Sequence, residues 1–186
     1  LSPPLDINVG VPQGTILGPI LFLLFINDLS NSVNGAQINI FADDVVVYFS
    51  HSSHETIETK MNEVMHNVYT WYQENKLALS LEKCSSMLIN GQRNSEKHEL
   101  SIRLGETTLE QVNHFKYLGI IIDDILDWKY QVAAVTRKVS FSNSRINRIR
   151  SVFPQFVLKK IYNAATLPIM DYASTVWGGS SSTHFE

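Results

Sequence analysis

One cysteine, Cys84, occurs among the 186 residues, so no disulfide can form within the chain, and an intracellular, reducing location is expected. The 6 histidines do not stand at zinc-ligand spacing beside cysteine or carboxylate partners. The longest apolar run, residues 16–26, is interrupted by Gly18 and Pro19 and is too short for a membrane span. These absences argue against a disulfide scaffold, a zinc site and a membrane-spanning segment.

Carboxylates are absent from residues 129–160, although the net charge of the whole chain is −3. The basic residues of that stretch are Lys129, Arg137, Lys138, Arg145, Arg148, Arg150, Lys159 and Lys160. Residues 1–75 are the reverse, because Lys60 is their single basic residue. This asymmetry suggests a polyanionic partner for the basic stretch, although charge alone favours an ordinary solvated helix face.

The chain begins with Leu1 and reaches its first methionine only at Met61. We therefore expect a fragment or a processed piece of a longer protein.

The expected fold class is α/β, with a mixed part over residues 1–122 and a helical part over 123–186. In the mixed part, the patterns predict a helix from Pro19 to about Leu29 that is buried on most sides, and a second helix from Ser53 to Glu74. The predicted hairpins are 37–41 with 45–49 and 101–104 with 107–109, and the further predicted strands are 77–81, 86–90 and 115–122. Helices are predicted after Asp127 to about Arg150 and from Pro154 through Thr166, followed by a Gly-Ser linker.

Asp43 and Asp44 are adjacent carboxylates at the tip of the first predicted hairpin. Neighbouring carboxylates repel each other, and unpaired charge beside packed strands is costly. A bound divalent cation relieves both problems, and oxygen ligands suit Mg²⁺. The alternative is a solvated turn, because aspartate is a common turn residue, and the pair taken alone favours that alternative.

A glycine-rich segment, Gly-Val-Pro-Gln-Gly-Thr-Ile-Leu-Gly-Pro over residues 10–19, precedes the first predicted helix. Glycine permits close backbone approach to a ligand, and the Gln13 amide offers both a donor and an acceptor. The segment suits a surface that contacts a nucleotide or a template strand, and a plain loop before a helix is the alternative.

This segment, followed by Ile26-Asn27-Asp28-Leu29 and then by Phe-Ala-Asp-Asp, resembles the reverse transcriptase of LINE-type (non-LTR) retrotransposons, with jockey-like elements most similar. The resemblance continues through residues 71–83, 114–119 and 172–178, and so covers almost the whole chain. Several motifs in one order are far more specific than any of them alone.

The resemblance implies a right-hand polymerase: a palm remnant of antiparallel sheet and packed helices over 1–122, then an α-helical thumb over 123–186. It implies catalytic and metal-binding roles for Asp43 and Asp44, with Mg²⁺ as cofactor and Mn²⁺ as an alternative, and a place for Lys83 near the triphosphate. The other implied site residues are Pro12, Gln13 and Gly14 at the nucleotide and template, Tyr117, Leu118 and Gly119 as primer grip, and Arg137, Lys138, Arg145 and Arg148 against the duplex.

The implied activity is RNA-directed DNA synthesis from a primer 3′ end by two-metal phosphoryl transfer. The implied partners are an RNA template, a DNA primer, deoxynucleoside triphosphates and the remainder of a polyprotein, which would include an endonuclease domain. The implied locations are the nucleus and cytoplasmic ribonucleoprotein. The family's other metal-binding aspartate precedes Gly10, so we expect the 186 residues alone to be inactive.

Two departures from the family pattern flank Lys83, where Ser80 and Cys84 replace the usual asparagine and threonine. Cys84 can still pack as a small apolar residue. Two rival functions remain open: a nucleic-acid-binding module that has lost catalysis, and a decayed copy without function.

Other signals have simpler explanations. Trp71, Tyr72, Trp128 and Trp177 could stack on bases, but packing is favoured for each. Asp123, Asp124 and Asp127 precede a predicted helix, where the macrodipole favours capping over a metal site.

Overall fold

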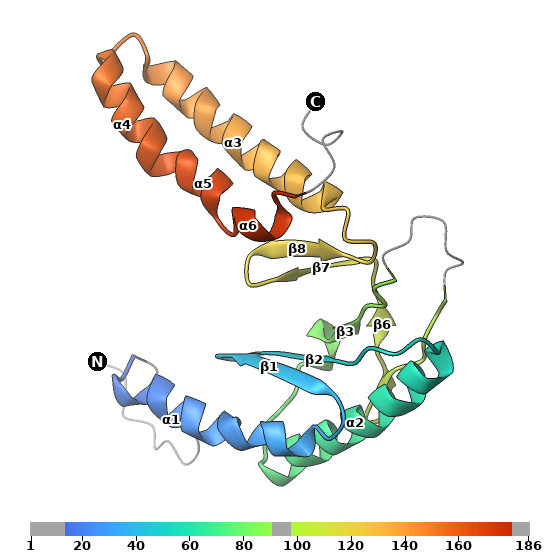
Figure 1. The fold of residues 1–186 in the computed structure, drawn as a ribbon. Helices are drawn as coiled ribbons and strands as arrows, with labels where there is room; N and C mark the ends of the chain where they lie inside the picture. Colours follow the sequence, from blue (N-terminus) through green and yellow to red (C-terminus); the bar gives the residue numbers. More distant parts are fainter. Residues whose placement is uncertain (1–13, 91–97, 180–186) are drawn as a thin grey trace. The chain divides into compact units, whose positions relative to one another are not determined.

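The structure is a computed structural model that describes residues 14–90 and 98–179 (Figure 1). The chain divides into two compact units. Unit 1 comprises Leu1–Ser85 and His98–Glu110, and unit 2 comprises Ser86–Lys97 and Gln111–Glu186. Helices and two-stranded antiparallel sheets occur together, which confirms the mixed α and β character of the prediction.

Unit 1 is built on helix α2 (His54–Glu74) and the hairpin of β1 (Gln37–Phe41) and β2 (Asp44–Tyr48). The predicted apolar spacing buries Val64, Val68 and Trp71 on one face of α2. The Ser53 hydroxyl caps the helix by accepting a hydrogen bond from the Thr56 N–H at 3.3 Å. Helix α2 ends at Asn75, so the prediction for this helix is confirmed.

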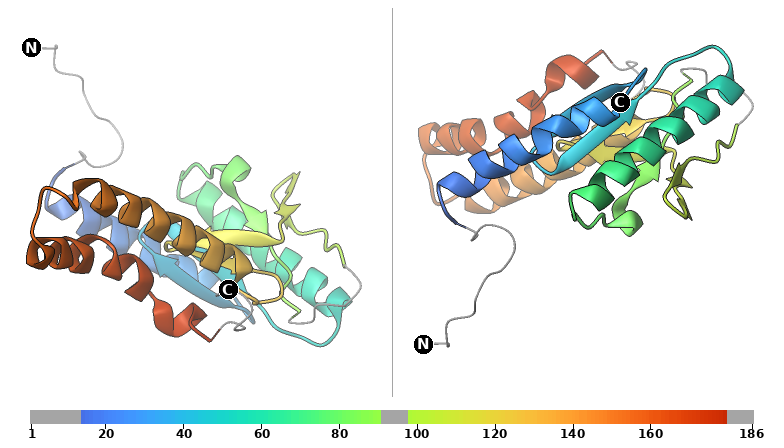
Figure 2. Two further views of the ribbon diagram at one scale, coloured as in Figure 1. Left: turned by 90° about the horizontal axis from the view of Figure 1, so that it is seen from above. Right: turned by 90° about the horizontal axis from the view of Figure 1, so that it is seen from below.

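The core of unit 1 lies between α2, the hairpin and the chain around it. The hairpin contributes the side chains of one face, Ile38, Ile40, Val45 and Val47, which pack against the buried cluster. The remaining elements are α1 (Leu17–Ile26), the 3₁₀ helices η1 (Asn27–Ser32) and η2 (Leu81–Lys83), and strands β4 (Arg103–Leu104) and β5 (Thr107–Thr108). Helices α1 and α2 lie on the same side of the β1–β2 hairpin (Figures 1 and 2).

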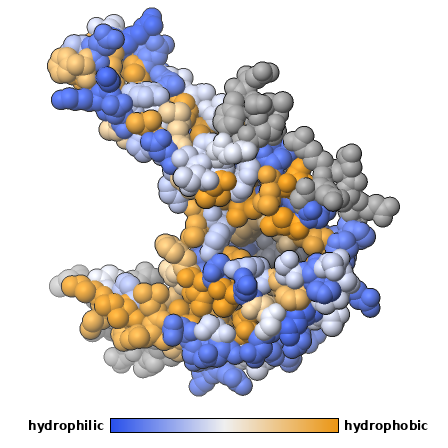
Figure 3. All heavy atoms as spheres, in the orientation of Figure 1, coloured by the Kyte–Doolittle hydropathy of each residue, from blue (hydrophilic) through white to orange (hydrophobic). Residues whose placement is uncertain are grey.

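Helix α1 is far more exposed than its sequence predicts. Ile20 is 52% exposed and Leu24 71%, whereas Gly18 and Ile26 are the buried residues of the helix. Apolar side chains therefore gather on the surface over α1 (Figure 3). The prediction of burial on most sides is wrong because an all-round apolar helix needs partners on every side, and the core of unit 1 covers only one.

No helix in the described parts of the chain combines the length and the apolar character that a bilayer crossing requires.

The strands predicted over residues 77–81 and 86–90 do not form as expected. Residues 77–81 form no strand, because Leu77, Leu79 and Leu81 pack against the core without a ladder partner. The strand predicted over 86–90 is reduced to β3 (Ser85–Ser86), which pairs with β6 (Glu110–Gln111). The hairpin predicted around Gly105-Glu106 is confirmed as β4 paired with β5.

Unit 2 contains the hairpin of β7 (His114–Tyr117) and β8 (Ile120–Asp123), followed by α3 (Lys129–Ile149) and α4 (Gln155–Ala165). Two short helices, α5 (Leu167–Asp171) and α6 (Ser174–Trp177), end the described part. The helix predictions are confirmed. The single strand predicted over 115–122 is wrong, since the chain reverses at Leu118-Gly119.

The division between the units differs from the predicted boundary at residue 123. The β7–β8 hairpin belongs to the helical unit because buried side chains join it to α3. The Gln131 side-chain oxygen accepts a hydrogen bond from the Ile121 N–H at 3.0 Å. The Asp123 carboxylate, which is fully buried, accepts one from the Trp128 N–H at 2.9 Å. The assignment of the parts as palm and thumb stays a prediction.

Candidate functional site

The β1–β2 hairpin places Asp43 in its turn and Asp44 at the start of β2. Phe41 pairs with Asp44, so Ala42 and Asp43 alone form the turn between the strands. Both carboxylates are exposed, and Asp44 lies on the face opposite the core-facing Ile40 and Val45. The predicted hairpin with both carboxylates at its tip is confirmed.

Backbone strain accompanies the turn. Ala42 has φ of 52°, a left-handed conformation that non-glycine residues adopt at a cost of about 1–2 kcal/mol. A positive φ at the first central residue is what a tight type II′ hairpin turn requires, and glycine is the usual residue there. Strained residues of this kind cluster at functional sites, so the strain adds weight to the carboxylates beside it.

The two carboxylates suit a divalent cation. Neither Asp43 nor Asp44 forms an ion pair with a basic side chain in the described residues. Within residues 14–90 and 98–179, no group of at least three His, Cys, Asp or Glu side chains is arranged to hold a metal ion. Mg²⁺ needs only one or two protein carboxylates when water and substrate phosphates complete its shell. The donor set of the turn therefore fits Mg²⁺ without forming a closed metal cage.

Of the glycine-rich segment, Pro12 and Gln13 lie outside the described residues. Gly14 is exposed with φ of 87°, and apart from its chain neighbours no heavy atom of the described residues lies within 4 Å of the place where a Cβ would be. The Thr15 hydroxyl accepts a hydrogen bond from the Gly18 N–H at 3.1 Å and so helps to begin α1. Gly14 is therefore open to a ligand, and its role at the nucleotide and template stays a prediction.

Lys83 is exposed on η2, within unit 1, and its place near the triphosphate stays a prediction. The neighbouring Cys84 packs against the core, as the sequence suggested. Burial raises the pKa of the Cys84 thiol, which therefore remains a neutral packing group. Burial also raises the pKa of the Tyr72 hydroxyl.

The predicted primer-grip residues form the turn of the β7–β8 hairpin. Tyr117 pairs with Ile120, and the two turn residues between them have positive φ, 45° at Leu118 and 84° at Gly119. A Cβ on Gly119 would lie 3.2 Å from Cε1 of Tyr172, so glycine is needed for both its conformation and its size.

Tyr172, which follows α5, contacts this turn, and the sequence did not indicate that contact. Its hydroxyl donates a hydrogen bond to the Leu118 carbonyl at 2.8 Å. The indole N–H of buried Trp177 in turn donates to the Tyr172 carbonyl at 3.0 Å. Because 54 residues separate Tyr172 from Leu118, no local pattern could have indicated this contact.

Carboxylates of the acidic cluster before α3 accept hydrogen bonds from backbone N–H groups of the turn that leads into the helix. The Asp123 carboxylate accepts hydrogen bonds from the N–H groups of Ile125, Asp127 and Trp128 at 3.3, 3.0 and 2.9 Å. Asp127 accepts another from the Lys129 N–H at 3.0 Å. The capping prediction is confirmed for Asp127, which reaches an N–H of α3, whereas Asp123 binds N–H groups of the turn before the helix. Packing is confirmed for Trp71, Tyr72 and Trp177, which are buried.

The predicted duplex-binding residues, Arg137, Lys138, Arg145 and Arg148, are all exposed on α3. Their successive spacings of one, seven and three residues keep them within about 100° of one another around the helix axis, on one side of the helix. The Arg145 guanidinium lies 5.9 Å from the ring centre of Phe141, which is on the same side. The structure thus gathers these cations on one helix, and their contact with a duplex stays a prediction.

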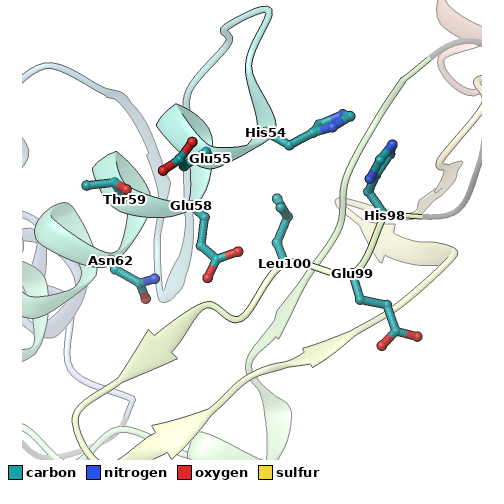
Figure 4. A pocket seen from close by; sticks show the side chains of 8 residues that line it. All are labelled: His54, Glu55, Glu58, Thr59, Asn62, His98, Glu99 and Leu100. Carbon is teal, nitrogen blue, oxygen red and sulfur yellow. The ribbon is translucent and has the colours of Figure 1, made fainter.

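A surface hollow of about 360 Å³ separates α2 from residues 98–100 (Figure 4). It is lined by His54, Glu55, Glu58, Thr59, Asn62, His98, Glu99 and Leu100, and contains none of the predicted site residues. The rings of His54 and His98 face each other with their centres 4.0 Å apart.

Comparison with known proteins gives one matching family. The model of the reverse transcriptase (RNA-dependent DNA polymerase) family matches residues 4–122. This range includes both carboxylates of the β1–β2 turn and the whole β7 strand.

Curated relatives come from insect retrotransposons. The Pol polyprotein of the type-1 retrotransposable element R1 2 of Nasonia vitripennis is 26% identical over 90% of the chain. The RNA-directed DNA polymerase from mobile element jockey of Drosophila funebris is 24% identical over 96% of the chain. The chain spans 43% and 20% of the lengths of these two relatives. No solved structure matches the chain.

Proposed function

The chain belongs to the reverse transcriptase (RNA-dependent DNA polymerase) family, and from this premise we propose that its Asp43-Asp44 turn forms part of a polymerase active site. The proposed reaction adds deoxynucleotides to a primer 3′ end under the direction of an RNA template. The observation that carries the proposal is the turn itself, where two exposed carboxylates are held in the register of a hairpin and have no ion-pair partner within residues 14–90 and 98–179.

The family match implies a palm-like polymerase fold for the matched residues. We assign unit 1 to the palm, because its hairpin carries the two carboxylates. We assign α3 to α6 to the thumb and the β7–β8 turn to the primer grip. Support comes from the attachment of that hairpin to α3 through Asp123 and Gln131, which makes grip and helix parts of one unit.

The residues divide the chemical work between them. When bound, divalent ions neutralise the triphosphate and lower the pKa of the primer 3′-hydroxyl. The carboxylates of Asp43 and Asp44 would hold such an ion, Mg²⁺ or Mn²⁺. Lys83 would stabilise the charge of the leaving pyrophosphate, and Leu118 and Gly119 would orient the primer end. Positioning and charge stabilisation are sufficient, because phosphoryl transfer requires little covalent chemistry from the protein.

The basic side of α3 would hold the nucleic acid through its phosphates, a contact that weakens with salt. Two names among the relatives, Pol polyprotein and RNA-directed DNA polymerase, support this reading. We propose that the remainder of such a polyprotein is the chain's natural partner and completes the site.

Primer extension on an RNA template tests the proposal, with the chain carried in its parent polypeptide. Asp43→Asn should lower the rate by about 10³-fold or more, because loss of a ligand's charge forfeits several kcal/mol of transition-state stabilisation. Glu106→Gln is the matched control, since Glu106 is exposed at the turn of another hairpin of unit 1. Equal extension by the Asp43→Asn variant and the unaltered protein would refute the proposal.

A nucleic-acid-binding module without catalysis is the second candidate. The exposed cations of α3 favour it, since they need no metal site to contact phosphate. It predicts salt-sensitive binding together with absence of extension by the parent polypeptide, whatever residue occupies position 43.

A further inference from the structure

An aromatic ring is exposed among the cations of α3. Phe141 is 67% exposed, and it stands four residues after Arg137 and four residues before Arg145. One helical turn therefore separates the ring from a guanidinium on either side, about 6 Å along the helix axis. Arg148 continues the same side of the helix.

Phe141 is not needed to pack α3 against its neighbours. The packing side of α3 carries other residues: Gln131 and Val132 are buried, and the Ser142 hydroxyl lies 2.7 Å from the Thr166 hydroxyl of the following helices. Ile146 lines a groove against α4. A phenyl ring that faces solvent contributes none of the stabilisation of a buried ring. We therefore consider a contact of Phe141 with a binding partner.

The surroundings of the ring favour an anionic partner. No carboxylate occurs between residues 129 and 160. The Arg145 guanidinium lies 5.9 Å from the ring centre of Phe141. Phosphates would pair with the flanking guanidinium groups, while an apolar, planar group of the same ligand would cover the ring.

An unpaired nucleotide combines these features. Its base offers a free π face, and its phosphates lie on either side of the base along the strand. In a duplex the base faces are covered by their neighbours, and a ring approaching from outside meets charged backbone. A single strand is therefore the partner that both the ring and the cations fit.

We propose that α3 binds single-stranded nucleic acid, with one base stacked on Phe141 and the adjoining phosphates paired with Arg137 and Arg145. This inference rests on the proposed contact between α3 and nucleic acid, and it adds a stacking site to that contact. Stacking on aromatic side chains tolerates any base, so the site would hold the strand without reading its sequence.

Fluorescence anisotropy of labelled oligonucleotides with the purified 186-residue chain tests the inference. Phe141→Ala should weaken binding of a short single strand about tenfold and leave the salt dependence unchanged, because stacking releases no counterions. Binding of a duplex should change less than about twofold. An abasic strand should lose affinity for the unaltered protein and lose almost none for the variant.

Phe156→Ala is the matched control, because Phe156 is 64% exposed on α4. It should leave single-strand binding unchanged. Phe141→Leu keeps apolar bulk without a ring and should weaken binding as alanine does, whereas Phe141→Trp should preserve it. Circular dichroism and thermal melting should show all of these variants folded, since the ring is exposed.

Arg137→Gln separates failure of the inference from failure of the proposed function. It should reduce the salt slope of single-strand binding by about 0.7, the value for one lost phosphate contact. If the slope falls but Phe141→Ala behaves like Phe156→Ala, the stacking site is refuted and the phosphate contact stands. If Phe141→Ala weakens duplex binding as much as single-strand binding, the ring contacts a duplex groove and the proposal is wrong. Absence of binding, or a slope unchanged by Arg137→Gln, would overturn both.

Discussion

Two hairpin turns carry residues of the candidate site, and they differ in the side chains that support them. The β1–β2 turn depends on its own backbone: Ala42 adopts a left-handed φ, and the carboxylates beside it are exposed. The β7–β8 turn also has a non-glycine residue, Leu118, at positive φ, but glycine follows it and the Leu118 carbonyl accepts a hydrogen bond from Tyr172. Its strands are also tied to α3 through buried Asp123 and Gln131.

Under the proposed function, this difference separates two tasks. A turn that holds a cation leaves its ligands open, so few protein side chains can contact it. A turn that must present its backbone to a primer end can be supported from behind by other side chains. Substitutions in the two turns should therefore act in different ways.

The largest effect should come from removing the support beneath the second turn. Asp123→Ala leaves three partly buried N–H groups without their charged acceptor, which should lower the free energy of unfolding by about 3 kcal/mol. Because the chain has two units, hydrogen exchange at the amides of β8 and α3 is the appropriate readout. Asp124→Ala, whose half-buried carboxylate is not part of this cap, should change it by less than about 0.5 kcal/mol. Equal effects of the two variants would show that the cap does not matter.

The next effect should appear at the second turn itself. Gly119→Ala places a Cβ 3.2 Å from Tyr172 at a φ of +84°, and should destabilise unit 2 by about 2 kcal/mol. Hydrogen exchange of the β7 and β8 amides in urea measures the change. Unchanged exchange would indicate that the turn does not require glycine.

The opposite sign is expected at the first turn. Ala42→Gly removes the left-handed strain of alanine and should stabilise the β1–β2 hairpin by about 1 kcal/mol. Hydrogen exchange of the β1 and β2 amides would slow accordingly. Faster exchange would mean that Ala42 is not strained in solution.

The smallest effect concerns the hydrogen bond from Tyr172, between α5 and α6, to the second turn. Tyr172→Phe removes the 2.8 Å bond to the Leu118 carbonyl, at a cost of about 0.5 kcal/mol because Tyr172 is exposed. If the bond positions the primer, extension by the parent polypeptide should fall more than this stability change explains. A fall no greater than that of Tyr162→Phe, a tyrosine of α4, would make the bond structural only.

The sequence predicted those elements whose signals are local. Helix α2 follows from its apolar period and its Ser53 cap, and the first hairpin from two β-prone runs around Asp43-Asp44. The residue pattern hid the second hairpin, because the β-prone run over 115–122 continues through Leu118-Gly119, and the family resemblance alone indicated a primer-grip hairpin there. The exposure of α1 could not be read from an all-round apolar helix, which shows no difference between its covered and uncovered sides.

The candidate site follows the same rule. Asp43 and Asp44 are adjacent in the chain, so their shared turn was predictable. The hydrogen bond from Tyr172 to Leu118 was not, because it depends on how α5 and α6 pack within unit 2. Phe141 was missed because its spacing of four residues from Arg137 and Arg145 shows which side chains lie beside it on the helix, but does not show that its ring is exposed.

Paramagnetic broadening by Mn²⁺ tests the central claim about the first turn most directly. In NMR spectra of the chain, the amide signals of residues 42–45 should broaden at lower Mn²⁺ concentrations than those near the other carboxylates. Asp43→Asn should abolish that selectivity. Broadening that begins elsewhere, or that is indifferent to Asp43→Asn, would contradict a cation site at this turn.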